Sequence, residues 1–139
     1  ACMAAIELNK KINPGQEDST TIKWLENVLD LVDDKDLIPN MCKAENGEIL
    51  TGSLGSSQSL ILCFMHDIDS ALGAKMFDKY KENFLIHRFG LPAIAEYPKG
   101  DGGNSHIDSG PIVWDVGAAA SIVGIRACYL YGDKKQQNK

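Results

Sequence analysis

The feature that most constrains the fold of this chain is a set of segments that are apolar on every side. The longest covers residues 111–130 (PIVWDVGAAASIVGIRACYL), in which only Asp115 and Arg126 are charged, and shorter ones cover residues 1–8 and 57–65. A helix that is apolar all round must be enclosed by other elements. Because two charges would make a membrane span costly, we interpret the longest segment as a buried helix of a water-soluble domain and expect no membrane partner.

Two amphipathic segments alternate with these apolar ones. In residues 20–32 and 70–88 the apolar side chains recur at steps of three and four, with charged residues between them. This spacing predicts helices with one buried face, capped by Ser19 and Ser70 and, for the second helix, stopped near Gly90. The apolar stripes consist of Ile22, Leu25, Val28, Leu29 and Val32, and of Leu72, Met76, Tyr80 and Phe84.

The alternation of enclosed and amphipathic segments predicts an all-α fold. Helical hairpins with alternating inner and outer helices would form part of an (α/α)6 toroid, with residues 1–132 as one domain and 133–139 as a polar tail. Strand patterns are poor, although Asn46-Gly47 could turn one short hairpin. The 139 residues supply about two and a half of six hairpins, so we expect either a fragment of a larger ring or self-association.

Composition excludes several classes of protein. The net charge of −5, without a basic run, argues against a nucleic-acid-binding protein. The four cysteines form no CxxC pair and the three histidines show no ligand spacing, so we predict neither a metal nor another cofactor. Cysteines inside apolar runs favour a reduced state and slightly favour the cytoplasm, while removal of a leader stays open because the chain begins with Ala1.

Two glycine-rich loops precede predicted inner helices, at residues 51–58 and 101–111 (DGGNSHIDSGP). If the inner helices run in one direction, their N-termini share one rim and these loops converge there. Helix N-termini favour anions and polar oxygens. In the alternative interpretation, Ser57 and Asp108 are helix caps and nothing more.

The candidate catalytic residues are two carboxylates near this rim. Glu96 and Asp108 could act as a paired acid and base, or as a general acid and a nucleophile. Glu96 could instead be a solvated loop carboxylate. Asp115 becomes a further candidate if it faces the centre of the ring. The predicted ligand-binding residues are Ser57, Gln58, Tyr97, Asn104, His106 and Asp115.

The motifs at residues 55–60 (GSSQSL), 88–92 (RFGLP), 96–98 (EYP) and 108–111 (DSGP) resemble the C-terminal part of uncharacterised bacterial toroid proteins. More widely, the pattern is similar to the six-hairpin glycosidase-like fold. That resemblance implies an (α/α)6 ring, which needs more than twice this length. The fold hosts glycoside hydrolases, polysaccharide lyases and isomerases, so fold analogy alone does not fix the activity.

Three hypotheses follow from these observations. The first is a carbohydrate-active enzyme, similar to a glycoside hydrolase, acting on a small-molecule or saccharide ligand. The second is a non-catalytic helical module that binds a ligand or a partner. The third is an isomerase or lyase that uses His106 or Tyr97 as the proton carrier.

Overall fold

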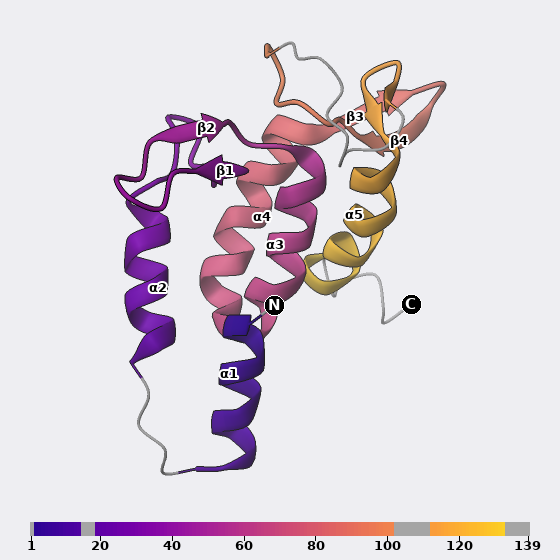
Figure 1. The fold of residues 1–139 in the computed structure, drawn as a ribbon. Helices are drawn as coiled ribbons and strands as arrows, with labels where there is room; N and C mark the ends of the chain where they lie inside the picture. Colours follow the sequence, from indigo (N-terminus) through magenta and orange to yellow (C-terminus); the bar gives the residue numbers. More distant parts are fainter. Residues whose placement is uncertain (1, 15–18, 102–111, 133–139) are drawn as a thin grey trace, which may run out of the picture.

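The computed structural model describes residues 2–14, 19–101 and 112–132, and Figure 1 shows the fold. The helices within these ranges are α1 (Cys2–Ile12), α2 (Thr20–Leu29), α3 (Gly55–Ile68), α4 (Ser70–Phe84) and α5 (Ala118–Tyr131). Three antiparallel pairs of short strands accompany them, namely β1 (Met41–Cys42) with β2 (Ile49–Thr51), β3 (Leu85–Arg88) with β4 (Leu91–Ile94), and β5 (Ile112–Val113) with β6 (Val116–Gly117). The predicted all-α toroid is therefore wrong, because the architecture is mixed α and β.

The hairpin β3–β4 replaces the end of the predicted helix over residues 70–88. Helix α4 ends at Phe84, and the next four residues pair with β4. The turn residues Phe89 and Gly90 both have positive φ, at 53° and 77°. A two-residue turn of this kind matches the natural twist of two antiparallel strands. Gly90 therefore turns a hairpin, whereas the sequence analysis assigned it to the end of a helix.

The hairpin β5–β6 replaces the start of the predicted helix over residues 111–130. Trp114 and Asp115 form its turn, with φ of 51° and 67°. The β-branched residues on either side favour strands, whereas the run of small residues from Ala118 favours a helix. Asp115 consequently lies in a turn and not on a helix facing the centre of a ring.

The core lies where α3 packs between α4 and α5. Tyr80 and Phe84 on α4 are almost completely buried, and their rings lie 5.6 Å apart. The Tyr80 hydroxyl is 2.6 Å from Ser59 Oγ on α3, so this buried polar group has a partner. A Cβ atom at Gly124 would lie 2.7 Å from the Tyr80 hydroxyl, which explains why α5 carries a glycine at this contact.

Helix α5 is not enclosed on all sides. Its inner residues Ala120 and Ala127 are fully buried, but Ile122, Ile125 and Tyr129 on the opposite side are 72%, 72% and 73% exposed. The apolar pattern correctly predicted a helix here from Ala118 onward. The expectation that neighbours cover its whole circumference is wrong within the described residues.

Candidate functional site

Glu96 lies at a junction where α3 and α5 begin. Helices α3 and α5 start at the same end of the molecule, as expected for inner helices, whereas α1, the third predicted inner helix, starts beside the C-terminal end of α3 (Figure 1). The amide of Gly55 donates to the Glu96 carbonyl at 2.8 Å, and Ser56 Oγ donates to Glu96 Oε1 at 2.5 Å. A Cβ atom at Gly117 would lie 2.4 Å from Glu96 Oε2. The starts of the two helices are thus packed against one glutamate.

The Glu96 side chain is inaccessible from outside, because the residue is 0% exposed. A carboxylate close to helix N-termini is favourable, because the partial positive charges there stabilise it. Its second oxygen, Oε2, has no hydrogen-bond partner among the described residues. This environment assigns Glu96 to the packing of the fold.

Ser57 and Gln58 also use their side chains within the fold. Ser57 Oγ donates to the Leu54 carbonyl at 3.0 Å, and Gln58 Nε2 donates to the Ile38 carbonyl. Gln58 is buried and holds the segment around Ile38 against α3. These two predicted ligand-binding residues therefore stabilise the start of α3 and its contact with the preceding loop.

A cleft of about 450 Å³ lies beside the junction. Ala95 and Tyr97 line it, whereas Glu96 between them does not. The residues on either side of segment 102–111, Asp101 and Ile112, also line the cleft. Its polar side chains are Arg88, Tyr97, Lys99, Asp101 and Asp115.

Arg88, which lines the cleft, links the β3–β4 hairpin to the β5–β6 hairpin. Its Nη2 lies 2.9 Å from Asp115 Oδ2, and its Nε donates to the Trp114 carbonyl at 3.1 Å. Both ion-pair partners stay accessible, since the Arg88 and Asp115 side chains are 40% and 78% exposed. A hydrogen-bonding ligand can therefore reach both side chains of the pair.

Lys99, which also lines the cleft, is anchored to the end of α4. Its backbone amide donates to the Asn83 carbonyl at 2.9 Å, and its Nζ donates to the Glu82 carbonyl at 2.7 Å. A cation at the C-terminus of a helix interacts favourably with the carbonyl groups that lack partners there. The ammonium group is thus held in place next to the cleft.

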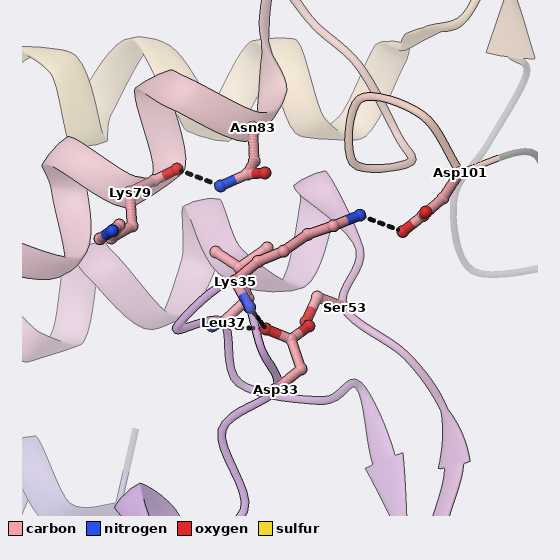
Figure 2. A network of polar contacts seen from close by, with 7 residues as sticks. All are labelled: Asp33, Lys35, Leu37, Ser53, Lys79, Asn83 and Asp101. Atoms are coloured by element: carbon pink, nitrogen blue, oxygen red, sulfur yellow. Dashed lines mark hydrogen bonds and ion pairs between the residues drawn. The ribbon is translucent and has the colours of Figure 1, made fainter.

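Figure 2 shows a polar network that links the segment after α2 to Asp101, a residue that lines the cleft. Asp33 Oδ1 accepts hydrogen bonds from the amides of Lys35 and Leu37 at 2.9 Å each, and Asp33 Oδ2 accepts one from Ser53 Oγ at 3.1 Å. Lys35 Nζ extends to Asp101 Oδ2 at 2.7 Å. This hydrogen bond raises the pKa of Lys35 above its ordinary value. Asp101 is thereby held by a turn that lies far from it in sequence.

Tyr97 supplies a hydrogen-bonding phenol to the cleft. Burial, together with the nearby charge of Glu96, raises the pKa of Tyr97 above its ordinary value of 10.0. The phenol is therefore protonated at neutral pH and can donate as well as accept a hydrogen bond.

The structure brings together only part of the predicted site. Tyr97 and Asp115 line the same cleft, whereas Ser57, Gln58 and Glu96 do not line it. Three further predicted residues, Asn104, His106 and Asp108, lie outside the described residues.

Three residues of the cleft were not among the predicted site residues, namely Arg88, Lys99 and Asp101. The signal for Arg88 was its place next to Phe89-Gly90, a pair that forms a two-residue hairpin turn. Lys99 lies in an irregular segment that no pattern marked, and Asp101 begins the predicted rim loop 101–111 but was not selected within it.

Comparison with protein-family models, with curated proteins and with solved structures finds no match to this chain. Within the described ranges, no group of three or more histidine, cysteine or acidic side chains could hold a metal ion. The same ranges contain no helix of sufficient length and apolar character to cross a membrane.

Proposed function

We propose that this protein is a binding module for an uncharged, polyhydroxylated ligand of the saccharide class. The observation that carries the proposal is the balance of charges in the cleft, where two cations and two carboxylates each have a polar partner. Paired charges of both signs offer donors and acceptors without a net field that would select a charged ligand. Hydroxyl groups, which donate and accept, suit such a lining.

Binding is favoured over hydrolysis by the position of Glu96. A glycoside hydrolase needs two carboxyl groups that flank the scissile bond. Glu96 is fully buried, and its Oε1 accepts a hydrogen bond from the hydroxyl group of Ser56. This burial favours a structural role for Glu96 and supports binding over hydrolysis by a Glu96–Asp108 pair.

Isothermal titration with glucose, galactose and mannose tests the proposal. Replacing Arg88 by Gln should weaken binding of the sugar by about tenfold, because one well-placed charged hydrogen bond is worth about that factor. The matched control is Lys43→Gln, which breaks an exposed ion pair with Glu48 (2.6 Å) on the β1–β2 hairpin. Absence of binding, or equal losses in both variants, would reject the cleft as the site.

A second candidate function is self-association through the outer face of α5, defined by Ile122, Ile125 and Tyr129. Three large apolar side chains that are more than 70% exposed on one side of a helix form a surface that water disfavours. A second copy of the chain can bury this face by packing helix against helix.

Sedimentation velocity over a concentration series tests self-association. Ile125→Asp should shift the protein to the monomer, because a charge would be buried in the contact. Ile22→Asp is the matched control, since Ile22 is an exposed isoleucine on α2. A wild-type protein that is monomeric at every concentration would exclude this function.

A further inference from the structure

Two hairpin tips beside the cleft hold aromatic residues in an unfavourable backbone conformation. Phe89, Trp114 and Asp115 all have positive φ, between 51° and 67°. Side chains other than glycine, asparagine and aspartate rarely adopt this conformation, and such strain is found at ligand-binding positions. Glycine or asparagine at these two positions would relieve the strain, yet the chain carries Phe89 and Trp114 there.

The two aromatic rings form one exposed unit. Their centroids lie 5.0 Å apart and their planes meet at 72°, so the edge of one ring packs against the face of the other. Phe89 is 80% exposed and Trp114 is 67% exposed. Leu91, which is 69% exposed, follows on the same hairpin and extends the apolar surface.

This aromatic unit adjoins the cleft through shared residues. Arg88, which lines the cleft, precedes Phe89 and donates to the Trp114 carbonyl at 3.1 Å. Asp115, which follows Trp114, also lines the cleft. A ligand that contacts the Arg88–Asp115 pair therefore has the aromatic pair next to it.

We propose that the Phe89–Trp114 pair is a stacking subsite, so that the preferred ligand is a saccharide chain of two or more residues and not a single sugar. This inference rests on the proposed function. A pyranose ring has an apolar face of C–H groups and an edge of hydroxyl groups. One residue of the chain places its hydroxyls in the cleft, and the next places its C–H face on an exposed aromatic ring. Aromatic rings supply rigid contact area at little cost in conformational entropy.

The test is a ladder of chain lengths, measured by titration calorimetry with glucose, cellobiose and cellotriose, and with mannose, mannobiose and mannotriose. In at least one series the trisaccharide should bind about tenfold more tightly than the monosaccharide, which is the gain expected from one added stacking contact. Trp114→Gly should remove this gain and leave the affinity for the monosaccharide unchanged. Glycine accepts the positive φ of the turn, and the carbonyl that pairs with Arg88 is retained.

Tyr129→Ala is the matched control, because it removes an equally exposed aromatic ring from α5 and should keep the gain. Equal affinities along both ladders, or a gain that survives in Trp114→Gly, would overturn the stacking subsite. In that event, a monosaccharide that still binds and still depends on Arg88 would leave the proposed function standing. If no sugar of either ladder binds, the proposed function itself is wrong and the subsite is rejected with it.

Discussion

Glu96 and Asp115 are two acidic residues that lie close together in space but belong to contrasting regions. Glu96 lies at the helix junction, whereas Asp115 lines the cleft. The Glu96 amide donates to the Asp115 carbonyl at 3.2 Å, so the two backbones are in contact. Glu96 is 0% exposed and sits among the starts of two helices. The Asp115 side chain is 78% exposed and pairs with Arg88.

The difference shows that proximity to a cleft does not make a carboxylate part of a binding site. At the junction, the side chains of Ser56, Gln58 and Glu96 direct their hydrogen bonds inward, to other parts of the fold. In the cleft, Arg88 and Asp115 form a pair that solvent and ligands can reach. Loss of a junction residue should therefore reduce stability, whereas loss of a cleft residue should reduce binding.

The largest effect is expected for Gly55→Ala at the junction. A Cβ atom at this position would lie 2.0 Å from the backbone oxygen of Ala95, which cannot move aside as a flexible side chain could. The free energy of unfolding should fall by about 3 kcal/mol, a large value for overpacking. The matched control is Gly52→Ala, three residues before α3, where no heavy atom lies within 4 Å of the added Cβ. Urea denaturation that gives equal midpoints for both variants would contradict the tight junction.

A smaller effect distinguishes the two carboxylates directly. Glu96→Ala should lower the free energy of unfolding by about 2 kcal/mol, because a charged hydrogen bond to Ser56 is lost from a buried site. Asp115→Asn should cost less than about 1 kcal/mol, since exposed ion pairs contribute little and asparagine tolerates the positive φ of 67°. Thermal unfolding measures both changes. A larger loss in the Asp115 variant would reverse the assignment of the two regions.

The smallest effect concerns the loss of stability at alkaline pH, which we expect to arise from buried tyrosines. Burial is the main cause that raises the pKa of Tyr131 to about 12, and its hydroxyl donates to the Leu62 carbonyl at 2.9 Å. Because ionisation is harder in the folded state, the contribution of Tyr131 to stability is fully present below pH 10, the ordinary pKa of tyrosine, and is lost as the pH rises towards 12.

Tyr131→Phe should therefore weaken the loss of stability between pH 10 and 12, as followed by urea denaturation at a series of pH values. Part of the loss should remain, because burial also raises the pKa of Tyr80. An unchanged pH dependence in Tyr131→Phe would show that this phenol does not contribute to the loss of stability at alkaline pH.

Local patterns predicted several elements well. The spacing of apolar residues predicted helices over residues 20–32 and 70–88, which contain α2 and α4, and the apolar run 57–65 lies within α3. Asn46-Gly47 indicated the one expected hairpin, which β1 and β2 form. These predictions succeeded because the signal of each element lies within its own residues.

The hairpins β3–β4 and β5–β6 escaped prediction because their turns carry unusual residues. Phe89, Trp114 and Asp115 take positive φ without being glycine, so the usual signals of a two-residue turn are weak. Contacts across the two hairpins, from Arg88 and from the paired aromatic rings, hold the tips together.

The sequence by itself determined that this chain folds around helices and where most of them lie. Only the tertiary structure decided which acidic residue is buried and which is accessible. The environment of a carboxylate depends on groups brought together from distant segments, such as Ser56 and Gly117 around Glu96, and Arg88 opposite Asp115. Local sequence has no access to those distances, so it could not show that Glu96 is buried whereas Asp115 lines the cleft.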